Sequence, residues 1–147
     1  MKAKSLLMLV AFPFLLILGC STPYQHSGAL SYGYSEKQLS DNVWRITFEG
    51  DAGTTANEAY DKATLRAADL AISHGYKYFI INDVQTTNRV STLGGKNSIS
   101  TSTFNYPTST ISVSMYKDKP DGTQAIYDAR FVCQKIGAEY DTVCGRQ

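Results

Sequence analysis

The feature that most constrains the fold is a double change of hydrophobic period along residues 43–85. Residues 43–49 alternate between apolar and polar side chains, which is typical of a half-buried strand. Residues 55–74 repeat at intervals of three and four, which predicts a helix. Residues 76–85 have apolar side chains at both odd and even positions, which predicts a central strand covered on both faces. Strand, helix and strand in this order predict a βαβ unit with parallel strands and a right-handed crossover.

The ends of the predicted helix carry their own signals. Thr55 followed three residues later by Glu58 is a capping-box pattern, and Gly75 directly after the last periodic residue is a C-cap signal. The apolar face of this helix is mostly alanine, so we expect it to approach its sheet closely.

Two more elements complete the predicted domain. Residues 110–117 alternate and predict a third strand, and residues 123–136 repeat at helical spacing. Within the latter, Ile126-Tyr127 and Phe131-Val132 would also suit a strand. The fold class expected is α/β in the α+β sense: one βαβ-containing domain with a three-stranded mixed sheet and two helices packed mainly on one face, after a cleaved signal peptide. A chain of 147 residues is long enough for one such domain, assigned to residues 32–147.

Residues 86–110 differ from the rest because nearly half of them are serine or threonine. The composition favours a mobile polar loop, although a structureless loop of that length is uncommon in a compact domain. The alternative is a polar hairpin in which Arg89–Leu93 pairs with Ser98–Phe104 around Gly94-Gly95.

The first nineteen residues have the pattern of a secretory signal. Lys2 and Lys4 form a short positive start, and the apolar run Ser5–Leu18 follows without a charge. That run is short for a membrane-spanning helix, which needs about 20 apolar residues. Residues 1–19 are therefore assigned to a signal peptide, with an uncleaved amino-terminal anchor as the alternative.

Ile17-Leu18-Gly19-Cys20 closes the apolar run and resembles the bacterial lipobox. The resemblance implies cleavage before Cys20, an N-acyl and an S-diacylglycerol lipid on Cys20, and no other cofactor. Ser21 rather than aspartate at the next position implies the outer membrane, facing the periplasm. The polar residues 20–31 are expected to form a flexible lipidated tether that spans about 18 Å. If Cys20 is incidental, the leader is a plain secretory signal.

The other two cysteines, Cys133 and Cys144, lie near the carboxyl end. An exported domain is found where disulfides form and persist, so a bridge between them is the simplest expectation. Such a bridge would contribute roughly 2–3 kcal/mol by closing its loop. A metal pair or a redox pair is the alternative, but neither cysteine has a neighbouring histidine and the spacing is not C-x-x-C.

The charge of the chain argues against a nucleic-acid partner. Without Lys2 and Lys4 the mature chain has 12 basic and 13 acidic side chains, a net charge of −1. Nucleic-acid binders carry a basic footprint that is missing here. The partners expected are the lipid bilayer, through the acyl anchor, and an unknown envelope protein or cell-wall component.

Several short motifs together resemble one group of small proteobacterial envelope lipoproteins. These motifs are Gly33-Tyr34-Ser35-Glu36, Phe48-x-Gly50, Leu65-Arg66-Ala67-Ala68 and Gly75-Tyr76-x-Tyr78-Phe79. The family pattern usually has asparagine where this chain has Asp51, and often glutamate where it has Asp69. The resemblance implies a lipoprotein with a βαβ core and carries no activity with it.

Glu36 and Arg66 both fall in this segment and are the candidate structural ion pair. A guanidinium fork on the flank of the helix can grip a carboxylate and fix the incoming chain. The alternative is a solvated Arg66 with Asp61 or Asp69 nearby.

Tyrosine is frequent, with ten in the chain. Because tyrosine combines contact area with a hydroxyl, it suits surfaces for partners or glycans. The alternative is that tyrosine simply suits half-exposed strands. The candidate binding surface comprises Tyr32, Tyr34, Tyr78 and Tyr116.

Catalytic and metal-binding signatures are missing from the sequence. Of the two histidines, His26 lies in the predicted tether and His74 at a helix end, where it is expected to cap or pack. No catalytic residue and no metal ligand is assigned. The function expected is therefore a non-enzymatic, membrane-anchored structural or interaction protein, with a small binding module for an envelope glycan or peptide as the alternative.

Overall fold

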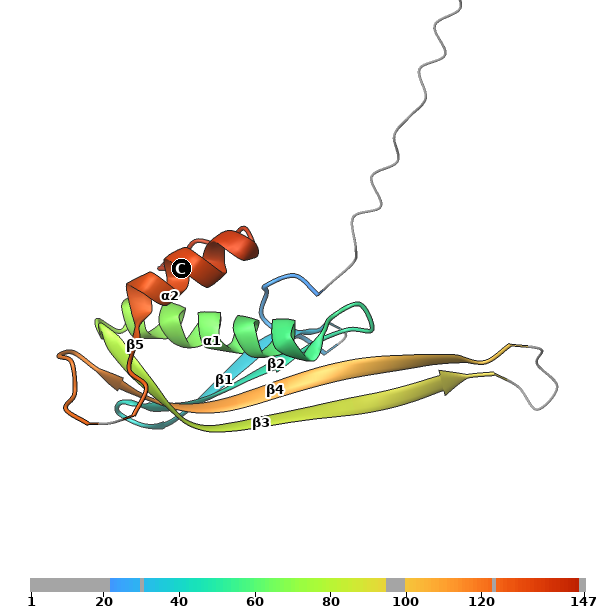
Figure 1. The fold of residues 1–147 in the computed structure, drawn as a ribbon, viewed down its shortest axis with the longest axis horizontal. Helices are drawn as coiled ribbons and strands as arrows, with labels where there is room; N and C mark the ends of the chain where they lie inside the picture. The colour runs from blue at the N-terminus through green and yellow to red at the C-terminus, as the bar shows by residue number, and fades with distance from the viewer. Residues whose placement is uncertain (1–21, 30, 95–99, 123, 146–147) are drawn as a thin grey trace, which may run out of the picture.

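The computed structural model describes residues 22–29, 31–94, 100–122 and 124–145, which form five strands and two helices (Figure 1). The strands are β1 (Gly33–Ser40), β2 (Val43–Glu49), β3 (Tyr78–Leu93), β4 (Ser102–Tyr116) and β5 (Tyr127–Asp128), and the helices are α1 (Ala56–Ser73) and α2 (Ala129–Glu139). The predicted signal peptide and Cys20 lie outside the described residues. In the described part of the chain, no helix has the length and apolar character needed to cross a bilayer.

The strands form one sheet in the order β1-β2-β4-β3-β5, and all its pairings are antiparallel. The predicted three-stranded mixed sheet is therefore wrong. Strands β2 and β3 do run in the same direction and are joined through α1, as a βαβ unit requires. However, β4 lies between them and is antiparallel to both. Insertion of a later strand is a long-range event that the local pattern of residues 43–85 does not encode.

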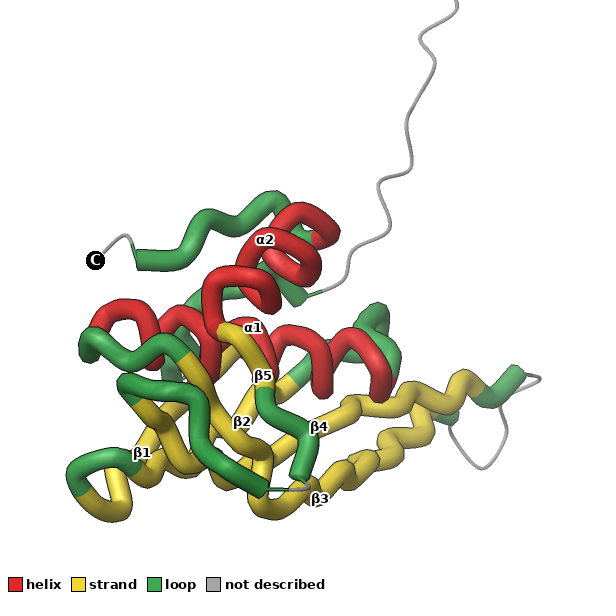
Figure 2. Tube along the Cα trace, turned by 60° about the vertical axis from the view of Figure 1, so that its left-hand side comes forward, coloured by secondary structure: helices red, strands yellow, loops and turns green. Residues whose placement is uncertain are grey.

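Helix α1 matches its prediction. Thr55 is the N-cap and forms a complete capping box with Glu58, and the alanine-rich face is buried on the sheet. In Figures 1 and 2, α2 lies on the side of α1 that faces away from the sheet. Both helices thus lie on one side of the sheet, as predicted, but they are stacked, so that α1 separates α2 from most of the sheet. Because it lies between two layers, α1 is buried on almost every side.

The second helix begins later than its periodicity suggests. Asp128 caps α2 by accepting a hydrogen bond from the Phe131 amide at 3.0 Å. Tyr127 and Asp128 form β5, which pairs with Phe79 and Tyr78 of β3. The strand alternative for this part of the chain is therefore correct at Tyr127. Strand β1 was not predicted, since its sequence is almost entirely polar.

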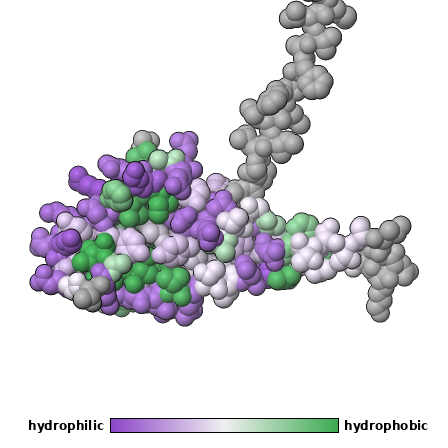
Figure 3. Space-filling model, viewed as in Figure 1, coloured by the Kyte–Doolittle hydropathy of each residue, from purple (hydrophilic) through white to green (hydrophobic). Residues whose placement is uncertain are grey.

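The Ser/Thr-rich residues 86–93 and 102–110 are paired strands, so the predicted loop is wrong and the alternative, a polar hairpin, is correct except for its register. Arg89 pairs with Tyr106 and Leu93 with Ser102. Threonine is β-branched and favours strands even where they are exposed, which explains the outcome. Strand β2 ends opposite Thr108, which also pairs with Thr87, so residues 88–93 and 102–107 extend beyond β2 as a narrow two-stranded arm (Figures 1 and 3).

Candidate functional site

The chain immediately after the proposed lipidation site is built into the domain. Thr22 is only 1% exposed. Its amide donates to the Thr54 hydroxyl at 3.1 Å, its hydroxyl accepts from the Asp51 amide at 2.7 Å, and its carbonyl accepts from Lys62 Nζ at 2.7 Å. We call residues 22–28 the N-terminal segment. The expectation that this segment is a flexible tether is therefore wrong, because its polar groups bond to the domain rather than to water.

Lys62 reaches Thr22 from the second turn of α1. It is 2% exposed, and its ammonium group lies 5.5 Å from the centre of the Phe48 ring and 4.7 Å from that of Tyr140. Burial lowers the pKa of Lys62 below its usual value. Aromatic faces and a backbone carbonyl stabilise a buried cation, so the lysine can hold the chain without leaving its charge unsatisfied.

The same segment also pairs with the beginning of β1. The Tyr34 amide donates to the Gln25 carbonyl, and the Ser27 amide donates to the Tyr34 carbonyl, both at 2.7 Å. Gly33 makes this approach possible. A Cβ built on Gly33 would lie 2.2 Å from the Gln25 carbonyl oxygen, and its φ of +146° is one that other residues rarely adopt.

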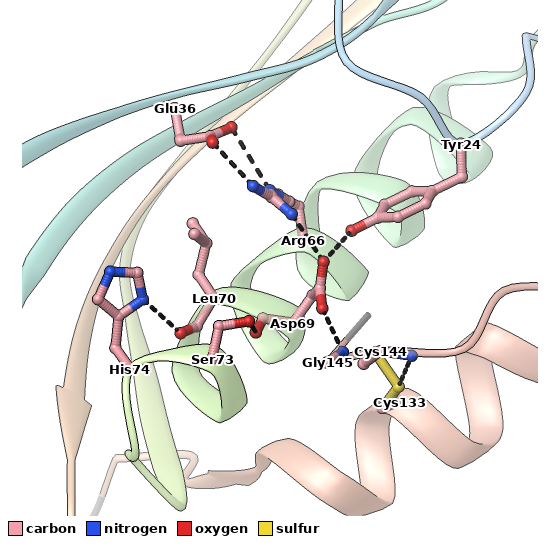
Figure 4. A network of polar contacts seen from close by, with 10 residues as sticks. All are labelled: Tyr24, Glu36, Arg66, Asp69, Leu70, Ser73, His74, Cys133, Cys144 and Gly145. Carbon is pink, nitrogen blue, oxygen red and sulfur yellow. Dashed lines mark hydrogen bonds and ion pairs between the residues drawn. A yellow bond between two sulfur atoms is a disulfide. The ribbon is translucent and has the colours of Figure 1, made fainter. Parts of the chain in front are cut away.

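The predicted ion pair is present and lies at the centre of a larger network (Figure 4). Arg66 Nη2 lies 2.8 Å from Glu36 Oε1, and Arg66 Nη1 lies 2.6 Å from Asp69 Oδ2. One guanidinium therefore bridges a carboxylate on β1 and a carboxylate on its own helix. The geometry uses both sides of the guanidinium fork, which a lysine cannot reproduce.

Asp69 connects both ends of the described chain to this network. The Tyr24 hydroxyl donates to Asp69 Oδ2 at 3.3 Å, and the Gly145 amide donates to Asp69 Oδ1 at 2.7 Å. Gly145 is held there by the neighbouring disulfide between Cys133 and Cys144, which confirms the predicted bridge (Figure 4). The N-terminal segment, α1 and the C-terminal tail are thus fixed by one carboxylate.

Two aromatic rings pack against the network. The guanidinium carbon of Arg66 lies 4.3 Å from the centre of the Tyr34 ring, and the rings of Tyr24 and Tyr34 are 4.9 Å apart. Burial alone would lower the pKa of Arg66, but the hydrogen bond and charge of Glu36 and the neighbouring Tyr24 outweigh it and raise the pKa. The pKa of Tyr24 is raised by burial first and by the charge of Asp69 second.

The raised pKa of Tyr24 predicts a loss of stability in alkali. The unfolded tyrosine ionises near pH 10, while the folded one stays neutral. The stabilising contribution is therefore complete below pH 10 and is lost as pH rises toward the folded pKa. Urea unfolding at pH 9 and pH 11 should show that the native protein loses about 1 kcal/mol more than the Tyr24→Phe variant. Other groups titrate in both proteins and cancel, so an equal loss in the two would contradict the buried position of Tyr24.

The four predicted tyrosines do not form one surface. Tyr32 stacks on Tyr106 at 6.0 Å near the base of the arm, and Tyr34 packs inside the network. Tyr78 and Tyr116 pair with each other at the opposite end of β4. Ten residues of strand separate Tyr106 from Tyr116, which is roughly 30 Å. The single tyrosine surface predicted from the sequence is therefore wrong.

The remaining candidate groups are structural in their contacts. His74 caps α1, with its Nδ1 2.9 Å from the Leu70 carbonyl oxygen, and its ring packs 5.0 Å from Trp44. His26 Nδ1 lies 2.7 Å from the Ser27 carbonyl oxygen. Within the described ranges, no three His, Cys, Asp or Glu side chains gather closely enough to hold a metal ion.

Two open grooves lie on the surface of the sheet and arm. One of about 250 Å³ lies on the uncovered sheet face and is lined by Arg45, Asp83, Gln85, Thr110 and Ser112. Another, of about 420 Å³, lies between the start of α1 and the arm, with Thr55, Asn88 and Asn105 in its lining. Both are lined mainly by hydroxyl, amide and charged groups, which suit a polar partner.

Sequence reasoning found Glu36 and Arg66 but missed Thr22, Tyr24 and Lys62. One signal was available: Lys62, Arg66 and Asp69 follow at spacings of four and three, so they form a polar stripe beside the alanine face. A polar stripe on a helix usually faces solvent. Only the structure shows that the N-terminal segment covers it.

Comparison of the chain with protein-family models, with curated proteins and with solved structures finds no match. The function proposed below therefore depends on the residues of this chain and their geometry.

Proposed function

We propose that this chain is a lipid-anchored bacterial envelope lipoprotein, acylated at Cys20, whose domain is a non-enzymatic interaction module held directly at the membrane surface. The observation that supports the proposal most is the fixed position of Thr22, two residues after Cys20. A flexible anchor would need no buried lysine at this point. A domain that must keep one orientation toward the leaflet needs such a fixed contact next to its anchor.

The distance from anchor to domain follows from chain geometry. Two residues of extended chain span at most about 7 Å. Acyl chains on Cys20 would therefore draw the Thr22 side of the domain against the lipid headgroups. Two or more acyl chains on one residue hold a protein on a bilayer essentially permanently.

In this orientation, the face of the sheet that no helix covers remains free to contact a partner. The N-terminal segment lies on the helical side of the sheet, at α1, so the opposite face of the sheet points away from it (Figure 1). That face carries Arg45, Thr47 and Asp83 among hydroxyl-rich neighbours. A polar envelope protein or cell-wall component is the partner that this surface fits.

Replacing Cys20 tests the anchor. Native membranes should retain the wild-type protein after a high-salt wash, and mass spectrometry of its amino-terminal peptide should show a Cys20 that carries diacylglycerol and an acyl chain. The Cys20→Ser variant should leave the washed membrane fraction almost completely, since it lacks the acyl chains that hold the protein. A Cys133→Ser/Cys144→Ser variant serves as the control and should remain in the membrane. Unmodified Cys20 in the native protein, or equal retention of Cys20→Ser, would contradict the proposal.

A further inference from the structure

One edge of the sheet is open along most of β3. Strand β4 pairs with one side of β3, but on the other side β5 reaches only Tyr78 and Phe79. Beyond these two residues no described strand pairs with this edge. Unpaired N–H and C=O groups along a strand are a template for another strand.

The other outer strand of the sheet is protected, whereas β3 is not. The N-terminal segment bonds to β1 at Tyr34, and β1 also carries Lys37 and an irregular register after Gln38. Such features are used by natural sheets to prevent edge-to-edge pairing. From Asp83 to Leu93, β3 has neither lysine nor proline, and its ladder with β4 is regular.

The charges of β3 favour a second copy of the same strand. Asp83 and Arg89 are the two charged residues of β3, and each lies three positions from Thr86. If two copies pair antiparallel about a two-fold axis at Thr86, Asp83 of each copy lies directly opposite Arg89 of the other. Opposite charges that face each other across antiparallel strands stabilise the pair, and a two-fold axis forms the contact twice.

The exposed apolar residues fit the same register. Val84 and Val90 are 46% and 58% exposed on the monomer. Both lie on the helix-side face of β3, because Val84 pairs with Ile111 and Val90 with Asn105. With the axis at Thr86, Val84 of one copy becomes a diagonal neighbour of Val90 of the other. Diagonal neighbours are about 7–8 Å apart, so each valine would cover part of the other.

We propose that the protein forms a two-fold symmetric dimer in which the β3 edges pair antiparallel about Thr86, so that one continuous sheet crosses both copies. This assembly does not depend on the lipid anchor. In a membrane-anchored protein it would point the two arms in opposite directions, each beside the first half of the other copy's β3.

Cysteine crosslinking in the full-length protein tests the register. A Thr86→Cys variant places its two thiols directly across the axis, whereas the Thr92→Cys thiols of a dimer would be roughly 40 Å apart. Both threonines are exposed and lie on the same face of β3. A short thiol-specific crosslinker should give a covalent homodimer with Thr86→Cys only. No dimer at Thr86, equal dimer at both positions, or a crosslink at Thr86 to a different protein would overturn the proposal.

Charge reversal gives a second, independent readout. In the Thr86→Cys background, Asp83→Arg alone should reduce the crosslinked dimer about tenfold, because arginine would then face arginine twice. Arg89→Asp alone should do the same. The combination of Asp83→Arg with Arg89→Asp should restore the dimer, since opposite charges face each other again. Arg89 also lies 4.8 Å from the centre of the Tyr106 ring and 3.4 Å from the Tyr32 hydroxyl, so circular dichroism should first show that each variant remains folded. Failure of the combined variant to restore crosslinking would overturn the register.

Discussion

Replacing Arg66 with alanine is expected to lower the free energy of unfolding by about 3 kcal/mol. The substitution leaves Glu36 without the guanidinium that neutralises it and removes half of the partners of Asp69 Oδ2. It also removes the cation packed on the Tyr34 ring. Removal of one member of a largely buried ion pair is more costly than the pair itself is favourable, because the remaining charge stays buried. Urea unfolding at neutral pH measures the loss directly.

Two further variants test whether the loss of stability in Arg66→Ala comes from the bridged carboxylates. Arg45→Ala removes an exposed arginine from β2 and should change the stability by less than about 0.5 kcal/mol. Arg66→Lys keeps the charge but cannot bridge two carboxylates, so its stability should lie between those of wild type and Arg66→Ala. If Arg66→Ala is no less stable than Arg45→Ala, the network does not hold the domain together.

Gly33→Ala is the second substitution with a large expected effect, about 3 kcal/mol. Part of this is backbone strain at a positive φ, about 1 kcal/mol. The rest, about 2 kcal/mol, comes from the two backbone hydrogen bonds between Tyr34 and the N-terminal segment, which cannot form with a Cβ 2.2 Å from the Gln25 oxygen. Urea unfolding measures the total, and proteolysis of the folded protein should cut the N-terminal segment more readily.

Gly122 provides a matched control for this experiment. Its φ is +148°, almost the same as that of Gly33, but a Cβ at this position would meet nothing within 4 Å. Gly122→Ala should therefore show the strain without the displacement of the segment. Equal losses in the two variants would mean that the close approach of Gln25 to Gly33 contributes nothing.

The elements that the sequence predicts well are those fixed by local interactions. The alternation around Trp44 and Ile46 identifies β2, and the Thr55–Glu58 capping box places the start of α1. Each depends on residues a few positions apart, which a pattern can show. The position of β4 between β2 and β3 depends on pairings such as Ile46 with Ile111, and no local period encodes such a partner.

The polar parts of the chain were the least predictable. The serine and threonine content of residues 86–110 predicts a loop, yet Thr87 and Thr108 face each other in a regular ladder. The N-terminal segment was read as a tether for the same reason. In both cases a polar composition was taken as evidence for solvation, whereas the polar groups are satisfied by pairing within the protein.

The ion pair of the candidate site could be predicted from the sequence, but the contacts of the N-terminal segment could not. Glu36 and Arg66 stood out because both lie in the segment that carries the family resemblance and their types form bidentate pairs. The contact of Lys62 with the N-terminal segment gave no such signal, since the backbone carbonyl and the two aromatic faces that it touches come from distant parts of the chain. A bond to a backbone carbonyl does not depend on the residue type of the acceptor, so it leaves no pattern in the sequence.

Hydrogen exchange of the N-terminal segment in the membrane-bound protein tests the central claim most directly. The amides of Thr22 and Ser27 donate hydrogen bonds within the domain, so they should exchange as slowly as those of β2, and the Ser27 amide should become fast in Gly33→Ala. Exchange of both amides at the rate of an unstructured peptide in the wild-type protein would show that the domain swings freely on its anchor, contrary to the structure described here.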